Sequence, residues 1–176
     1  MRPQAPYHFF WSGPFSQWHP SLIKLDGVIF DFAEQAMMHQ KALLFEDTQA
    51  AERILSAPEP SEQKAIGQQV RAFDQATWDA RKINIVLRIS RAKYQQNDGL
   101  RRKLFQTGRA LLAEASPHDL IWGIGMDAKT AAVTDPDYWP GQNLLGRILT
   151  QVRDEMAAMY PDQAMAAAPE VNWYDP

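Results

Sequence analysis

The sequence predicts a mainly α-helical fold: a single multihelical domain with a small N-terminal β-hairpin. Helical spacing of apolar residues persists from Ala33 almost to Tyr160. An Asp26-Gly27 pair stands between two apolar runs, and such a pair is typical of the tight turn of a hairpin. The length of 176 residues corresponds to about one domain.

The expected elements follow from these patterns and from the prolines and glycines that interrupt them. The apolar runs on either side of Asp26-Gly27 predict the two hairpin strands. The helices are expected at 33–44, 48–56, 61–69, 75–96, 99–112, a short one from 117, and 143–159. Residues 1–160 should therefore form the domain. Residues 161–176 are expected to be a loosely attached tail, in which Trp173 and Tyr174 are apolar enough to dock.

The composition excludes several kinds of site. The absence of cysteine removes thiol nucleophiles, thiolate-bound metals and disulfides, and it agrees with a reducing cytoplasm, where we expect the protein. The four histidines lack metal-ligand spacing, so no metal or other cofactor is expected. Prolines interrupt the N-terminal segment and no apolar run approaches about 18 residues, which argues against a signal peptide and a membrane span.

The charges are unevenly distributed along a chain whose net charge is −3. Between Arg81 and Arg109 lie nine basic residues and one acidic residue, a net charge of +8. The remainder has nine basic and twenty acidic residues, a net charge of −11. A local positive field inside an acidic protein suits a small phosphate-bearing ligand better than a long polyanion. The alternative is that these residues form two solvated helix faces.

The predicted helix 33–44 carries charges on its apolar side. Glu34 and Lys41 share a face with Met37, Met38 and Phe45, whereas Gln35 and His39 lie where a solvated stripe is expected. Seven residues separate Glu34 from Lys41, about 10 Å along the helix axis. That is too far for a direct ion pair, but a ligand could lie between the two groups, as in a site for acid or base catalysis. The alternative is an ordinary helix edge with snorkelling side chains.

A second carboxylate lies beside an aromatic residue further along the chain. Asp119 and Trp122 would project from one face of a helix starting near Pro117. The competing interpretation is a helix start with Ser116 as N-cap and Asp119 closing a capping box. Trp78 begins another apolar stripe, so it is either a core residue or a surface that stacks on a heterocyclic base. The following Gly123-Ile124-Gly125 is interpreted as a turn.

Six motifs in order resemble the YbiA-like, or NADAR, family, from about Phe9 to Met156. They are SGPFSQW (12–18), AEQAMMHQKALLF (33–45), TWDARK (77–82), AKYQQNDGLRRKLFQTG (92–108), LAEASPHDLIWGIG (112–125) and GQNLLGRILTQVR (141–153). The resemblance implies a mainly helical single domain that hydrolyses N-glycosidic bonds. Some members split phosphoribosylamino-pyrimidine intermediates of riboflavin synthesis, and others remove ADP-ribose from guanine. This chain departs from the family pattern at Gln17-Trp18 and Ala33, which bears on the choice of substrate.

The resemblance also implies roles for individual residues. Catalysis is expected from three of them, with Glu34 activating water, Lys41 binding an anionic group, and Asp119 holding the base or delivering its proton. The expected substrate-binding residues are Trp78, Trp122, Phe15, Ser16, Lys93, Gly123 and Asn143. Asn143 has the alternative of capping the last helix. The expected partner is a small phosphoribosyl or ADP-ribosyl substrate, or an ADP-ribosylated nucleic acid.

Two other functions compete with this hypothesis. A non-catalytic sensor of ADP-ribose or nucleotides would use the same tryptophans, and only turnover separates it from an enzyme. The presence of both Glu34 and Lys41 favours the enzyme. A nucleic-acid-binding module would depend on the basic segment alone and would show a steep salt dependence.

Overall fold

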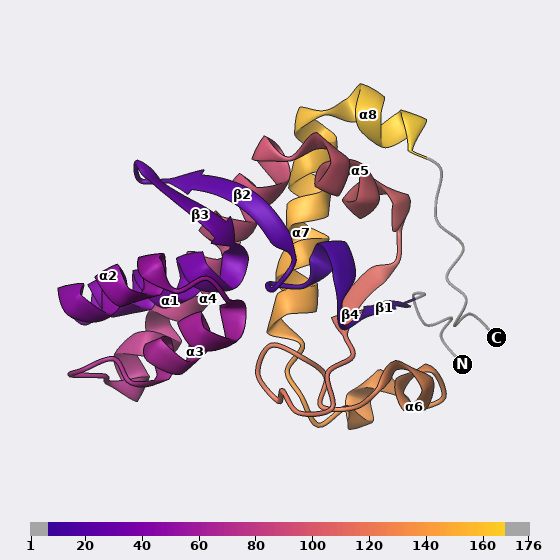
Figure 1. Ribbon diagram of the computed structural model, residues 1–176. Helices are drawn as coiled ribbons and strands as arrows, with labels where there is room; N and C mark the ends of the chain where they lie inside the picture. The colour runs from indigo at the N-terminus through magenta and orange to yellow at the C-terminus, as the bar shows by residue number, and fades with distance from the viewer. Residues whose placement is uncertain (1–6, 168–176) are drawn as a thin grey trace. The chain divides into compact units, whose positions relative to one another are not determined.

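A computed structural model describes residues 7–167 and confirms the mainly α-helical fold (Figure 1). The chain forms two compact units, which are described separately below. The central unit comprises residues 17–97. The terminal unit joins the two ends of the chain, residues 1–16 and 98–176, of which 7–16 and 98–167 are described.

The predicted hairpin is present in the central unit. Strands β2 (Pro20–Leu25) and β3 (Val28–Phe32) pair antiparallel, with Leu25 opposite Val28. Asp26 and Gly27 connect them with φ angles of 52° and 80°. Two consecutive positive φ angles are required by the tight turn that suits the twist of a hairpin, and Asp-Gly adopts them readily.

The four helices of the central unit begin and end within one residue of the predicted positions. They are α1 (Ala33–Leu44), α2 (Thr48–Ser56), α3 (Pro60–Gln68) and α4 (Gln75–Gln96). Asp47 and Asp74 cap α2 and α4, since the side chain of each accepts a hydrogen bond from a backbone N–H three residues later. Helix α1 contacts α2, α3, α4 and β3, so it lies at the centre of the unit.

The central position of α1 corrects one prediction. Gln35 and His39 were expected near a solvated stripe, but both are buried. The Gln35 side chain accepts a hydrogen bond from the Asp31 N–H at 2.9 Å and donates one to the Ile54 carbonyl at 3.3 Å. The His39 ring lies edge-on to Phe30, with ring centroids 5.2 Å apart. A helix packed on several sides has no stripe left for water, so its polar residues are buried as well.

The terminal unit contains a parallel strand pair and a long helix (Figure 1). Strand β1 (Tyr7–Phe10) pairs with β4 (Leu111–Glu114), and α7 (Leu144–Met159) packs on β4. The other elements are η1 (Gly13–Phe15), α5 (Asp98–Gln106), α6 (Ala128–Ala132), η2 (Pro136–Tyr138) and α8 (Pro161–Ala166). Helices α5 and α8 lie together at one end of α7 (Figure 1).

The prediction of a helix over 99–112 is wrong in its second half. Helix α5 ends at Gln106, and Gly108 follows with a φ of 59°. A positive φ is incompatible with continuing an α-helix and favours glycine. The chain then enters β4, whose register with β1 places Tyr7 opposite Leu111. Helix propensity is overridden here by pairing with a strand roughly a hundred residues away in the sequence.

The tail predicted from Pro161 begins with an ordered helix. Helix α8 contacts α5 and α7, and the Arg101 side chain donates a hydrogen bond to Gln163 Oε1 at 2.9 Å. The Arg101 guanidinium also lies over the Tyr160 ring, 3.9 Å from its centroid. Trp173 and Tyr174, which were expected to dock, lie outside the described residues.

Candidate active site

Glu34 is buried in the first turn of α1, as the sequence predicted from its apolar face. Its side chain is 4% exposed, and its backbone N–H donates to the Gln17 carbonyl at 3.0 Å. The N-terminus of a helix carries partial positive charge, which stabilises a carboxylate placed there. The hydrogen bond at the helix start thus fixes the position of Glu34.

Lys41 lies two turns further along α1 and has a defined environment. Its ammonium donates a hydrogen bond to the Gly67 carbonyl at 2.8 Å. It also lies over the rings of Phe73 and Trp78, 4.5 and 5.5 Å from their centroids, within the range of cation–π attraction. Burial lowers the pKa of Lys41, and the negative charge of Glu34 opposes that shift. The two groups are therefore coupled electrostatically.

Gly67 and Phe73 complete the surroundings of Lys41, and sequence reasoning did not identify either residue. Gly67 lies in α3, and a Cβ built on it would stand 2.0 Å from the Met38 sulfur. Phe73 lies between α3 and α4, where its ring meets Phe45 edge-on with centroids 5.2 Å apart. A glycine inside a predicted helix was the one available signal, since it often marks a close approach of two backbones.

We expect Gly67→Ala to destabilise the protein by about 1–3 kcal/mol, because α3 can approach α1 closely only without a side chain at this position. The free energy of unfolding in urea measures the loss. Gly99→Ala is the control, since no atom lies within 4 Å of a Cβ at this position of α5. Alanine is the better helix former, so the control should be unchanged or more stable by up to about 1 kcal/mol. Equal effects of both variants would contradict the close approach.

Trp78 lies in the first turn of α4 and is 8% exposed. This burial agrees with the core interpretation of the stripe. The contact with the Lys41 ammonium nevertheless places the indole beside the charged pair. The neighbouring Asp79 accepts a hydrogen bond from Lys82 at 2.5 Å, and this bond lowers the pKa of Asp79. The N-terminal part of α4 thus combines an aromatic side chain with the charged pair of Asp79 and Lys82.

Lys93 is almost fully buried in the second half of α4. Burial lowers its pKa from an ordinary value of 10.5 to about 7. The pKa of His19 is lowered by burial and further by the positive charge of Lys93, so the two groups interact electrostatically. Lys82 and Arg101 are also buried, which shows that the basic segment is not simply a pair of solvated faces.

The pKa of Lys93 predicts a pH dependence of stability. Between pH 7 and 10.5 the unfolded chain keeps a proton at this position, whereas the folded chain loses it. The free energy of unfolding must therefore rise with pH in that window. Lys93→Met should remove this part of the slope, and Lys24→Met, on an exposed residue, should keep it. Denaturant titrations from pH 7 to 10 measure both slopes. The same slope in Lys93→Met as in the unchanged protein would contradict the assignment.

Asp119 and Trp122 belong to the terminal unit, and the short helix predicted from 117 is absent. Asp119 Oδ1 accepts hydrogen bonds from the N–H groups of Ile121 and Trp122, at 2.9 and 2.7 Å. The carboxylate thus closes a turn and not a capping box, because no helix follows it. Serine, proline and aspartate start helices and close turns alike, so the sequence pattern was ambiguous. Both bonds use Oδ1, which leaves Oδ2 without a partner among the described residues.

Asn143 and Gly123 hold the turn against the start of α7. Asn143 precedes α7 with a φ of 53° but makes no side-chain cap bond, so the capping interpretation is wrong. Its amide instead accepts from the Glu114 N–H and donates to the Leu112 carbonyl, both at 3.0 Å. The Gly123 carbonyl accepts the Asn143 N–H at 3.0 Å, consistent with the predicted turn at Gly123. A ribose contact by Asn143 stays a prediction.

Phe15 and Ser16 end the N-terminal segment of the terminal unit. Phe15 is 5% exposed and receives edge contacts from His8 and Phe10, at centroid distances of 5.4 and 5.6 Å. The Ser16 N–H donates to the Gly13 carbonyl at 3.0 Å, which closes η1. The structure thus brings Glu34, Lys41 and Trp78 together in the central unit. Asp119, Trp122, Gly123 and Asn143 form a second group in the terminal unit.

Two further properties concern the whole described chain. Residues 7–167 contain no cluster of three histidine, aspartate or glutamate side chains able to hold a metal ion. Within the same range, every helix is too short or too polar to cross a membrane.

The NADAR domain profile matches residues 9–157, which span both units. This match covers most of the chain and agrees with the order of motifs in the sequence. The chain belongs to the NADAR family.

Relatives and a solved structure agree with this assignment. A protein of Acanthamoeba polyphaga mimivirus named N-glycosidase R617 is 42% identical over 146 residues, covering 80% of this chain and 86% of the viral one. A riboflavin biosynthesis protein of Vibrio vulnificus is 28% identical over 149 residues, but this chain spans only 37% of its length. The NMR structure of the E. coli protein YbiA superposes with a TM-score of 0.73 at 27% identity, covering 90% and 89% of the two chains. These similarities place the protein among the N-glycosidases.

Proposed function

We propose that this protein hydrolyses the N-glycosidic bond between a phosphorylated ribose and a heterocyclic base. Two substrates fit: a phosphoribosylamino-pyrimidine intermediate of riboflavin synthesis, or ADP-ribosyl guanine, either free or within a nucleic acid. The names of the relatives support the bond type and, for the Vibrio protein, the riboflavin pathway. The charged and aromatic groups around α1 support the presence of phosphate and base.

The reaction requires three things of the protein. Cleavage of the C1′–N bond develops positive charge on the ribose, so a carboxylate must stabilise it. A water molecule must add to C1′ and lose its proton, and the departing nitrogen must gain one. We assign to Glu34 both the stabilisation of positive charge on the ribose and the acceptance of the water proton. We assign the proton for the base, or the hydrogen bond that holds it, to Asp119.

The coupling between Glu34 and Lys41 is the observation that carries this assignment. A buried carboxylate at a helix start and a partly buried ammonium interact across two turns of α1. The negative charge of Glu34 raises the pKa of Lys41 against the effect of burial, and the ammonium in turn favours ionised Glu34. A carboxylate in its ionised form is suited to receive a proton from water.

The remaining expected residues would bind the substrate. Trp78 and Trp122 would stack on the heterocycle, and such stacking contributes about 1–3 kcal/mol per base. Lys93, with a pKa of about 7, would take up a proton when a phosphate group binds beside it. Substrate binding above pH 7 would then be accompanied by proton uptake. This linkage distinguishes a phosphate contact by Lys93 from a purely structural role.

The two substrates can be separated by comparing kcat/KM for a phosphoribosylamino-pyrimidine with kcat/KM for ADP-ribosyl guanine. Mass spectrometry of the released sugar identifies ribose phosphate in the first case and ADP-ribose in the second. A strong preference for either identifies the substrate class. Tight binding of ADP-ribose without turnover of either substrate would favour a non-catalytic sensor, and the proposal would be wrong.

A further inference from the structure

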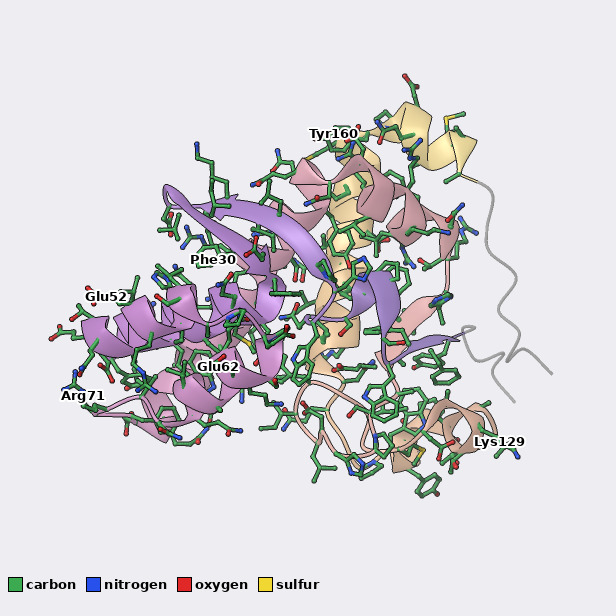
Figure 2. All side chains as sticks on the ribbon, in the orientation of Figure 1. Phe30, Glu52, Glu62, Arg71, Lys129 and Tyr160 are labelled. Atoms are coloured by element: carbon green, nitrogen blue, oxygen red, sulfur yellow. The ribbon has the colours of Figure 1, made fainter. Side chains whose placement is uncertain are left out.

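The β2–β3 hairpin of the central unit has one covered face and one exposed face, because side chains alternate between the two faces along a strand. On the covered face, Ile23 and Phe30 are fully buried. The Phe30 ring, labelled in Figure 2, meets His39 of α1. The other face, called the outer face of the hairpin here, is formed by four exposed residues: Leu22 and Lys24 of β2, and Ile29 and Asp31 of β3.

Side chains already bond to both edges of the hairpin. At the β2 edge, the Lys24 N–H donates to Gln96 Oε1 at 2.8 Å, and the Lys24 carbonyl accepts from Gln96 Nε2 at 2.9 Å. At the β3 edge, the Asp31 N–H donates to Gln35 Oε1 at 2.9 Å. Edges covered in this way disfavour the addition of another strand. A partner of the hairpin would therefore contact its outer face.

The apolar part of the outer face is a continuous patch. Leu22 is 63% exposed and Ile29 is 59% exposed. Ile29 lies opposite Lys24 in the strand register, and Leu22 stands two residues before Lys24, so Leu22 and Ile29 are diagonal neighbours. Diagonal neighbours on one sheet face are about 7–8 Å apart, within reach of long side chains. The two side chains thus form one apolar diagonal.

Lys24 and Asp31 form the other diagonal of the same face. Lys24 lies opposite Ile29, and Asp31 stands two residues after Ile29. Neither Lys24 nor Asp31 forms an ion pair with another side chain within residues 7–167. The outer face therefore has an apolar diagonal crossed by a charged diagonal with one positive and one negative end.

This arrangement is complementary to itself. A two-fold axis along the apolar diagonal would place Leu22 on Leu22 and Ile29 on Ile29 of a second copy. The same axis exchanges the two ends of the charged diagonal, so Lys24 of each copy would meet Asp31 of the other. Reciprocal contacts of this kind define a two-fold dimer. A partner surface of a single charge sign would instead be repelled at one end of the charged diagonal.

We propose that the outer face of the hairpin is a homodimer interface, with Lys24 of each copy paired to Asp31 of the other around Leu22 and Ile29. The strands of the two hairpins would cross steeply, as in orthogonal packing of sheets. A two-stranded face buries a small area, so the dimer is weak and forms at high protein concentration. The proposal does not depend on the glycosidase assignment, because none of the four residues belongs to the candidate active site.

Sedimentation equilibrium of the full chain over a series of concentrations tests the proposal, and the unchanged protein should show a monomer–dimer equilibrium. Lys24→Glu and Asp31→Lys each place like charges together at both symmetric contacts, so each should weaken dimerisation about tenfold or more. Leu22→Ser should weaken it about fivefold, as for loss of one apolar contact. Lys64→Glu, on an exposed residue of α3, changes the net charge as Lys24→Glu does and should dimerise normally.

An equimolar mixture of Lys24→Glu and Asp31→Lys separates the interface from a general effect of charge. In the mixed dimer each introduced charge meets an opposite charge, so the mixture should dimerise about as tightly as the unchanged protein. The double variant should recover dimerisation by itself for the same reason. The proposal is overturned if the unchanged protein stays monomeric up to about 1 mM. It is equally overturned if the two single variants dimerise normally, or if neither the mixture nor the double variant restores the dimer.

Discussion

Glu34→Gln should reduce turnover by about a hundredfold or more, as expected for loss of a general base. Glutamine keeps the shape of the side chain but cannot accept a proton from water or stabilise positive charge on the ribose. The protein should remain folded, because Lys41 keeps its bond to the Gly67 carbonyl and its contact with Phe73. Loss of the negative charge should also lower the pKa of Lys41 further, since Glu34 now raises it.

Steady-state kinetics and far-UV circular dichroism measure these effects on the same samples. Glu52→Gln is the matched control, because Glu52 is exposed on α2 (Figure 2) and should be replaceable without loss of activity. Near-normal turnover of Glu34→Gln would remove this residue from the mechanism. A loss of activity that is explained fully by unfolding would lead to the same conclusion.

Asp119→Asn should also reduce turnover by about a hundredfold or more, while changing stability little. The asparagine carbonyl oxygen can accept the same two hydrogen bonds from Ile121 and Trp122 that Oδ1 accepts now. The amide cannot deliver a proton or carry a charge. Asp119→Ala removes both hydrogen bonds, so it should in addition destabilise the protein by roughly 0.5–2 kcal/mol, as for loss of a cap.

The thermal midpoint and the turnover per folded molecule separate the two roles of Asp119. Asp137→Asn is the matched control on an exposed aspartate of the same unit. If Asp119→Asn keeps its activity, the carboxylate serves only to close the turn. The double variant with Glu34→Gln adds a further test, because groups that act in one step show non-additive losses. Losses that simply multiply would contradict joint action of the two carboxylates.

The parts of the fold that depend on local signals were predictable from the sequence. Asp26-Gly27 specifies a hairpin turn, and Asp47 and Asp74 cap the helices that follow them. The pairing of β1 with β4 was not predictable, because each strand is four residues long and their partners are far apart in the sequence. Short strands carry too little alternation to compete with helical spacing.

In the candidate site, too, some features follow from local sequence signals, whereas others depend on tertiary packing. Burial of Glu34 followed from its position among apolar residues of one helix face, and the structure confirms it. The acceptor of the Lys41 ammonium comes from α3 and its aromatic neighbour Phe73 from the following loop, so both depend on tertiary packing. Spacing within α1 identifies the charged pair but not the groups that hold it.

Product analysis tests the central claim most directly. The protein is incubated with each of the two substrates, and all products are quantified by mass spectrometry. Hydrolysis of the N-glycosidic bond predicts one free base and one ribose phosphate or ADP-ribose for each substrate consumed, with the sugar product gaining the hydroxyl of water. Formation should be at least about a hundredfold slower with Glu34→Gln. Release of inorganic phosphate with the base still attached to ribose, or no products from the folded protein with either substrate, would contradict it.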